Sequence, residues 1–271
     1  MARRGKRNTW LARALALFVL AGAAAAGWLW WDIQHWRPGD DAYPDQGVLI
    51  AQEDGSVNFR TVGAIGGRFA YLVASTGERD KDEMFARNLT RAREAGLQVG
   101  ALHAFDPCTR ADGQSANFVT MVPRTDNMLP PVIALTRTAE SCDERVSEAA
   151  VESELMTFIN QVEKHTGKPV ILKIGPEFEA TYAISGKLER QLWVARTRFE
   201  PTYTRRPWLL WSANEHLRTE ASEEPLEWVV VRPCPKMRRL SPQPAMRPRG
   251  PIPPIPAMRW ARPCALPTGP S

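Results

Sequence analysis

The sequence predicts an α/β protein, a β/α barrel preceded by one transmembrane helix. The chain has 271 residues, of which 44% are hydrophobic, so it can bury one sizeable core. After residue 45, eight short apolar segments alternate with polar or amphipathic ones, in the manner of β/α units. Residues 10–31 form a long apolar stretch near the start of the chain. Length, alternation and this stretch together define the predicted fold class.

The N-terminal segment is expected to anchor the protein in the inner (cytoplasmic) membrane. Residues 1–9 are basic, and the eighteen residues from Ala14 to Trp31 carry no charge, which is long enough for a membrane span. Because basic residues stay on the cytoplasmic side, residues 1–9 should be cytoplasmic and the rest of the chain periplasmic or extracytoplasmic. The tryptophans at the end of the 10–31 span suit the opposite membrane interface. The alternative is a cleaved signal peptide, with a small-residue site at 23–25.

Residues 32–45 are expected to be a linker, and residues 46–231 to form the barrel. Two amphipathic segments, 82–95 and 148–165, should be helices; each has its apolar residues on one face and a glycine just after its end. The candidate strands are 46–51, 68–74, 97–103, 130–135, 169–174, 190–195, 207–212 and 226–231. Side chains at the carboxyl ends of such strands converge on one cleft.

The charge distribution argues against nucleic-acid binding. The net charge of +5 comes from the two ends of the chain, whereas residues 32–231 contain 22 basic and 30 acidic residues and have a net charge of −8. No basic patch belongs to the predicted barrel. The sequence offers no C-x-x-C pair and only four scattered histidines, so neither a metal site nor a cofactor is expected.

Cys108 follows the third predicted strand and Cys142 the fourth, and adjacent parallel strands would bring both to one rim. In an oxidising compartment we therefore expect a disulfide between them, with two unpaired thiols as the alternative. Such a bond would stabilise the fold by about 3–4 kcal/mol on the chain-entropy model.

Five segments, in order and at matching spacing, resemble family 25 glycoside hydrolases, the lysozyme-type muramidases. The family patterns are G-[IV]-D-[VI]-S-x-x-Q-G-x-[IV]-D-W, F-A-Y-[IL]-K-A-T-E-G, A-G-[LI]-x-x-G-A-Y-H-F-F, L-P-P-x-x-D-x-E and [VI]-D-x-N. The matching segments of this chain are GVLIAQEDGSVNF (47–59), FAYLVASTG (69–77), AGLQVGALHAF (95–105), LPPVIALT (129–136) and LEWV (226–229). The resemblance covers roughly residues 46–231 and implies a flattened barrel that is incomplete in helices.

The resemblance also locates the catalytic acids of the family, and most are replaced here. Leu49, Ala134 and Thr136 stand at three acidic positions, and only Glu227 retains a carboxylate. The resemblance implies that these four residues line the same end of the barrel. Cleavage of the glycosidic link needs two acidic or equivalent groups, so we expect the activity to be impaired. The alternative is that carboxylates have relocated to nearby loops, with Glu53, Asp54, Asp106 and Glu177 as candidates.

His103, Phe105 and Trp211 are the candidate glycan-binding residues. His103 stands where the family has a cleft histidine, and the two aromatic residues fall at or near strand ends, where they could pack against sugar rings. The competing interpretation for each is a structural role in the core. The expected partners are peptidoglycan glycan strands and the membrane.

Residues 232–271 contain twelve of the 23 prolines, eight basic residues and no acid, which predicts a disordered Pro/Arg-rich tail. Electrostatic attachment to the envelope and a displaced reading frame are the two interpretations of this tail. For the whole chain, the sequence favours a membrane-anchored, lysozyme-like domain that binds glycan or a partner protein, or a decaying gene product, over an active muramidase with relocated carboxylates.

Overall fold

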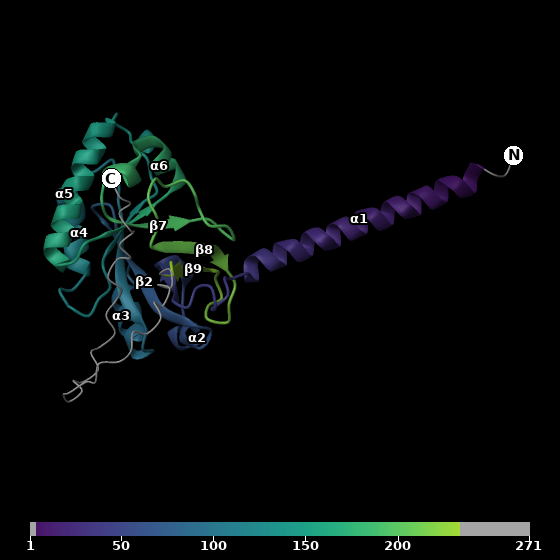
Figure 1. Ribbon diagram of the computed structural model, residues 1–271, viewed down its shortest axis with the longest axis horizontal. Coiled ribbons are helices and arrows are strands. Elements are labelled where there is room, and N and C mark those ends of the chain that lie inside the picture. The colour runs from purple at the N-terminus through teal and green to yellow at the C-terminus, as the bar shows by residue number, and fades with distance from the viewer. Residues whose placement is uncertain (1–3, 234–271) are drawn as a thin grey trace, which may run out of the picture. The chain divides into compact units, whose positions relative to one another are not determined.

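The computed structural model describes residues 4–233 and has the predicted α/β architecture, an eight-stranded closed barrel with an apolar helix at the N-terminus (Figure 1). Helix α1 spans Arg4–His35, and the compact unit that contains the barrel ends at Arg232. The predicted tail from residue 234 onward, like residues 1–3, lies outside the described residues.

The strands of the described segment form one sheet that closes on itself. Its order is β1-β9-β8-β7-β6-β5-β4-β2, with β1 pairing back to β2, and the two-residue strand β3 added to β2 as a hairpin. The bounds are β1 Gln46–Ile50, β2 Gly67–Thr76, β3 Asp80–Lys81, β4 Gln98–Ala104, β5 Val132–Leu135, β6 Ile171–Ile174, β7 Gln191–Ala195, β8 Leu210–Leu217 and β9 Leu226–Val231. All eight predicted strand segments therefore correspond to observed strands.

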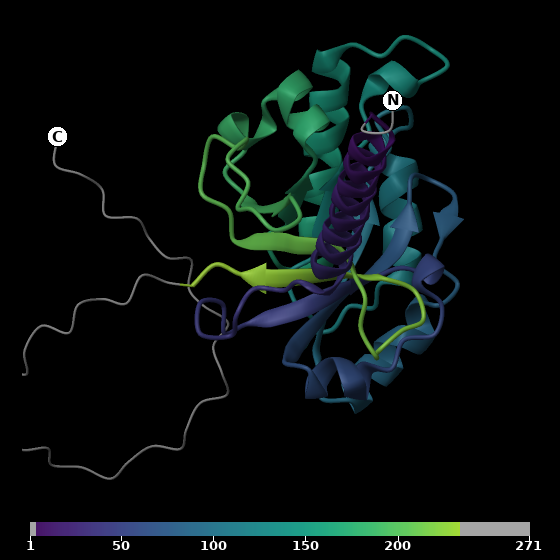
Figure 2. The same cartoon turned by 90° about the vertical axis from the view of Figure 1, so that its right-hand side faces the viewer.

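The last strand corrects the expectation of a parallel barrel. β9 runs antiparallel to both β8 and β1, whereas β1, β2, β4, β5, β6, β7 and β8 are parallel along the sheet. Only residues 218–225 connect β8 to β9. A parallel crossover needs a dozen or more residues, so this short connection forces a hairpin. Figure 2 shows β9 beside β8 where the barrel closes.

Helices cover the outside of the barrel incompletely. Their bounds are α2 Phe59–Ala64, α3 Phe85–Glu94, α4 Ala111–Met121, α5 Glu148–Thr166, α6 Pro176–Tyr182 and α7 Ile184–Lys187, with short 3-10 turns η1 Gln52–Asp54 and η2 Ala139–Ser141. α5 starts at the Ser147 cap and ends at Gly167, whose φ of 69° suits glycine. No α-helix lies between β7 and β8 or between β8 and β9, so the barrel is incomplete on that side.

Two apolar clusters hold the fold together. The larger one packs the outer faces of the strands against the helices. The smaller fills the barrel lumen and includes Leu49, Tyr71, Ala134, Trp193 and Val229. Strand alternation separates the two clusters, because successive side chains point to opposite faces of the sheet. The lumen is therefore a packed core whose polar residues gather at one end.

The segment predicted as a linker is bound to the barrel in the structure. α1 continues to His35, four residues beyond the predicted span, and residues 36–45 pack against the last strands. The Asn214 side chain donates hydrogen bonds to the backbone carbonyls of Ile33 and Trp36, both at 2.8 Å. The Gln46 side chain similarly contacts Pro38, Asp40 and Tyr43. These contacts fix the end of α1 against β8.

Candidate functional site

The barrel mouth is the end of the barrel where Leu49, Ala134, Lys173 and Glu227 meet. Leu49 pairs with Glu227 across β1 and β9, and Ala134 pairs with Lys173 across β5 and β6. Leu49 and Ala134 both belong to the lumen cluster. Thr136 follows the end of β5 and is exposed. The structure thus brings three of the four positions that the sequence singled out to the same end of the lumen, with Thr136 just beyond it.

Glu227 forms an ion pair with Lys173, a residue that was not among the predicted site residues. Lys173 Nζ lies 2.6 Å and 2.7 Å from the two carboxylate oxygens of Glu227, and the two side chains are only 12% and 18% exposed. Lys173 Nζ also lies 5.2 Å from the centre of the Trp193 ring, as in a cation–π contact. The Glu227 carboxylate therefore shares its charge with a neighbouring ammonium.

Two further side chains complete this buried polar network. Trp193 Nε1 donates to Ser212 Oγ at 2.7 Å, and Ser212 Oγ donates in turn to Glu227 Oε1. Trp193 and Ser212 are fully buried. Glu227 thus accepts hydrogen bonds from both Lys173 and Ser212.

One signal could have identified Lys173 from the sequence. It is the only charged residue in the apolar run 170–174. It lies two positions after Ile171, so its side chain points to the same face of the strand, toward the lumen. A cation at a lumen position needs a partner to be buried. The antiparallel β9 supplies that partner through Glu227.

Acidic side chains surround the mouth and influence each other. Burial and, after it, the negative charges of Glu53, Glu227 and Asp82 raise the pKa of Asp54 to about 6, against a backbone hydrogen bond from Ala51 that lowers it. Ala51 N–H donates to Asp54 Oδ2 at 2.8 Å. Asp54 is therefore a carboxyl group that protonates more readily than an ordinary aspartate.

Glu215 and Asp82 show the same tendency. Desolvation and the charge of Glu227 raise the pKa of Glu215, while Lys173 and His216 lower it. Desolvation also raises the pKa of Asp82, against hydrogen bonds from the backbone of Met84, Gln52 and Phe85 that lower it. Asp106 and Glu177, the other relocation candidates, have different surroundings: Asp106 pairs with Arg137 at 3.4 Å, and Glu177 is exposed on the first turn of α6.

The three candidate glycan-binding residues are all buried, which favours the structural interpretation of each over a surface offered to a sugar. His103 is fully buried outside the lumen, where its ring meets Phe118 edge-on and lies tilted against Phe158. Its Nδ1 lies 2.8 Å from Ser75 Oγ and its Nε2 lies 3.2 Å from Gln114 Oε1. Burial lowers the pKa of His103 to about 4, although the Gln114 hydrogen bond raises it. The ring is therefore neutral at pH 7.

Phe105 and Trp211 have structural surroundings as well. Phe105 is 3% exposed and packs near Phe158, and Trp211 is 2% exposed. Trp211 Nε1 donates to the Arg196 carbonyl at 2.9 Å, and the indole packs beside Trp36 and Tyr43. Trp211, a candidate for sugar binding, thus packs against the segment that follows α1.

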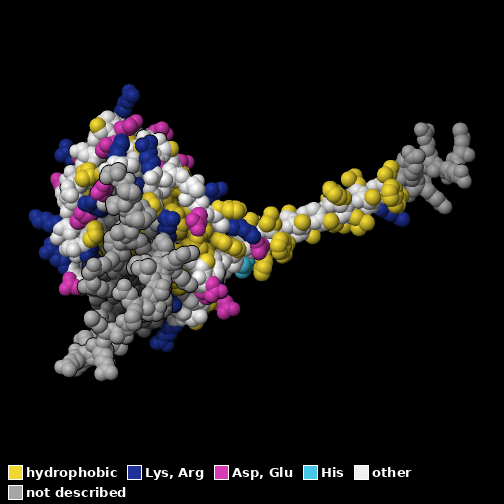
Figure 3. Space-filling view, viewed as in Figure 1, with side chains coloured by type: hydrophobic (Ala, Val, Ile, Leu, Met, Phe, Trp, Pro, Cys, Tyr) yellow, Lys and Arg dark blue, Asp and Glu magenta, His cyan; other side chains and the backbone are white. Residues whose placement is uncertain are grey.

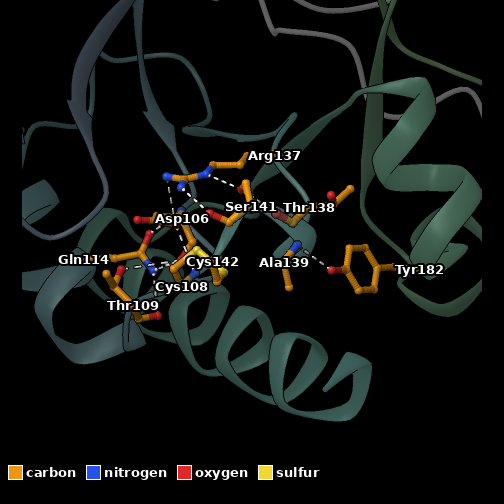
Figure 4. Close-up of a disulfide and its surroundings, with 10 residues drawn as sticks. All are labelled: Asp106, Cys108, Thr109, Gln114, Arg137, Thr138, Ala139, Ser141, Cys142 and Tyr182. Carbon is orange, nitrogen blue, oxygen red and sulfur yellow. Dashed lines mark hydrogen bonds and ion pairs between the residues drawn. A yellow bond between two sulfur atoms is a disulfide. The ribbon is translucent and has the colours of Figure 1, made fainter. Parts of the chain in front are cut away.

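A disulfide joins the loops after β4 and β5 near the mouth. Cys108 and Cys142 are bonded, with their Cα atoms 5.3 Å apart (Figure 4). Around it, Arg137 binds Asp106 and the Ser141 side chain, and the Tyr182 hydroxyl accepts a hydrogen bond from Ala139 N–H at 2.9 Å. The bond ties together two loops that adjoin Thr136. Within residues 4–233, no group of three or more His, Cys, Asp or Glu side chains is arranged to hold a metal ion.

The family model for glycosyl hydrolases family 25 matches residues 49–220, more than half of the chain. The chain belongs to this family. A family 25 glycosyl hydrolase from Bacillus anthracis superimposes with a TM-score of 0.66 at 27% identity, covering 73% of this chain and 92% of that one. The bacterial lysozyme from Streptomyces coelicolor has the same fold, with a TM-score of 0.61 at 22% identity over 69% of this chain and 91% of that one.

Similarity in sequence extends to other bacterial proteins. The protein YegX of Escherichia coli K12, which is uncharacterised, is 28% identical over 169 residues, 60% of this chain and 58% of its own length. Lysozyme M1 of Streptomyces globisporus is 34% identical over 73 residues, covering 27% of this chain and 25% of its own length. This family 25 chain thus matches just over half the length of YegX and a quarter of Lysozyme M1.

Proposed function

We propose that this protein is a membrane-anchored family 25 domain that associates with peptidoglycan, with its catalytic function impaired, and that it acts by binding glycan strands or a partner protein. The ion pair of Lys173 with Glu227 carries the proposal. The chain has the family 25 barrel, on which we base glycan binding. The side chains at its mouth differ from those that glycoside cleavage requires.

Glycoside cleavage needs one group to protonate the leaving oxygen and a second to stabilise positive charge at the anomeric carbon or to activate water. Leu49, Ala134 and Thr136 supply neither group. Glu227 would have to act alone, yet both of its oxygens bind the Lys173 ammonium. A carboxylate whose two oxygens are both occupied by an ammonium is not free to contact a glycosidic oxygen or an attacking water. Each missing acid or base is worth roughly 10²–10⁴-fold in rate, so the ordinary reaction should be slower by many orders of magnitude.

One specific observation favours the alternative function, an active muramidase that hydrolyses the MurNAc–GlcNAc β-1,4 link with relocated carboxylates. Asp54 adjoins the mouth, and its pKa of about 6 is suitable for a general acid at neutral pH. The hydrogen bond from Ala51 N–H to Asp54 gives the same side chain a structural role in the turn after β1. Asp54 is therefore the residue whose substitution separates the two functions.

The membrane location rests on α1. Residues Arg13–His35 form one helix that is long and apolar enough to cross a membrane and whose side chains are not buried within the described protein, a description that a signal sequence also fits. We propose the anchor, with residues 1–9 cytoplasmic, because the apolar surface continues to tryptophans 28, 30 and 31 and α1 is bound to the barrel beyond them. The domain would then lie outside the cytoplasm, where the Cys108–Cys142 bond is stable.

The test uses the full chain in mild detergent, assayed on insoluble peptidoglycan for retention and for muropeptide release. We expect retention without release. Release by the wild type that is lost in Asp54→Asn but kept in Glu53→Gln would establish the relocated mechanism and refute impairment. Absence of retention would refute glycan binding and leave a partner protein as the ligand. Fractionation of the full chain tests the anchor, which a soluble product would contradict.

A further inference from the structure

We propose that the turn at Arg196–Phe199, between β7 and β8, is a second membrane contact that docks on the phospholipid surface beside the end of α1. This inference rests on the proposed membrane anchoring and goes beyond it, because an anchor alone requires no contact between the barrel and the lipid. It assigns a lipid-binding role to a turn outside the family's cleft.

The first observation is the exposure of Phe199 next to basic side chains. Phe199 is 61% exposed, the only large apolar side chain of the described barrel with so much free surface. The Arg196 guanidinium lies 5.5 Å from the centre of its ring. An aromatic ring flanked by arginine suits the membrane interface, where the ring enters the acyl boundary and the cation meets phosphate groups.

The second observation is the position of the turn along α1. Arg198 Nη1 lies 2.6 Å from Asp32 Oδ2, and its guanidinium lies 5.9 Å from the centre of the Trp36 ring. Asp32 directly follows Trp31 at the end of the proposed span, so the ion pair holds the turn at the level where α1 leaves the membrane. Hydrophobic side chains continue along α1 up to this junction (Figure 3). The lipid surface is therefore within reach of Phe199.

The third observation is the backbone of Arg198. Its φ is 72°, a conformation that costs energy for a residue with a side chain. Two contacts hold it there, the ion pair with Asp32 and the hydrogen bond from Arg198 N–H to the Ala213 carbonyl at 2.8 Å. The contact with α1 thus fixes the turn that carries Phe199.

The neighbouring charges favour an anionic surface. Arg196 is exposed and Arg218 is tied to Gln34 of α1, whereas Asp32 is neutralised by Arg198 and Glu200 accepts a hydrogen bond from Tyr43. The exposed Arg196 beside the Phe199 ring attracts phosphate headgroups, and the attraction is reduced by salt.

The experiment places an environment-sensitive fluorophore at position 199 of the full chain. Phe199→Cys is made with Cys234→Ser and Cys264→Ser, which leaves the Cys108–Cys142 bond intact, and the labelled protein is reconstituted into vesicles of phosphatidylethanolamine and phosphatidylglycerol. Met156→Cys in the same background is the matched control, because Met156 is an exposed apolar residue on α5, on the side of the barrel away from β8 (Figure 1). Lipids with a quencher near the headgroup report contact.

We expect a blue-shifted emission and at least twofold stronger quenching at position 199 than at 156. Phe199→Cys combined with Arg198→Ala should lose most of this difference while the protein stays in the membrane. Equal, water-like emission at both positions in protein that floats with the vesicles would overturn the docking and leave the anchor intact. Protein that fails to float with vesicles would overturn the anchor, and the docking with it.

Discussion

Replacement of Lys173 by methionine tests the central feature of the barrel mouth. Methionine keeps most of the side-chain volume and removes the ammonium that both oxygens of Glu227 contact at 2.6 and 2.7 Å. Ser212 remains as a hydrogen-bond donor. Loss of one partner of a buried pair costs about 3–5 kcal/mol, and the 18% exposure of Glu227 places the expected loss near 3 kcal/mol, at the lower end of that range.

The measurement is thermal unfolding of the wild type, Lys173→Met, Glu227→Gln and the double variant, followed by circular dichroism in one detergent. For a domain of this size, about 3 kcal/mol corresponds to a decrease in Tm of roughly 6–12 °C. The double variant should be more stable than Lys173→Met, because it leaves no uncompensated buried charge.

Two results would refute the reasoning. A Lys173→Met protein as stable as the wild type would mean that solvent already screens Glu227. Strictly additive effects in the double variant would mean that the two side chains do not interact in solution. Either result would mean that Lys173 does not neutralise the Glu227 carboxylate.

Three other predictions concern chemistry, acid stability and the disulfide. Leu49→Asp, Ala134→Asp and Thr136→Glu together should give detectable muropeptide release only when combined with Lys173→Met, which frees Glu227; release without the lysine substitution would show that the ion pair does not block the site. His103 has a pKa lowered to about 4, below its unfolded value, so its neutral form stabilises the native state at pH 7 and that contribution falls as pH decreases from 6.5 towards 4; in urea unfolding, His103→Asn should lose less stability between pH 7 and pH 5 than the wild type. Opening the Cys108–Cys142 bond, which spans 34 residues, should cost about 4 kcal/mol on the chain-entropy model, and equal stability of Cys108→Ser/Cys142→Ser would contradict it.

Much of the fold could be predicted because its signals are local. Apolar runs located all eight barrel strands, and helix α5 begins and ends where Ser147 and Gly167 indicate. The direction of β9 was not predicted, because strand direction depends on the length of the preceding connection and not on the composition of the strand. The sequence placed His103, Phe105 and Trp211 at or near strand ends and left open whether each faces the cleft or the core. Each lies one position away from a lumen residue, and a one-residue shift moves a side chain to the other face.

The interior of the mouth shows how the site depends on pairs that are distant in sequence. Lys173 and Glu227 are separated by 54 residues, and neither is informative alone, since a lysine in an apolar run and a glutamate at a family position each allow several interpretations. Antiparallel β9 enters the barrel beside β1, which places Glu227 opposite Leu49 and within reach of Lys173. An aspartate at position 49 would bring a second negative charge next to that pair and compete for the ammonium. Leucine at 49 and alanine at 134 leave Lys173 with Glu227 as its carboxylate partner, so the apolar side chains at these two positions and the ion pair are physically coupled features of one mouth.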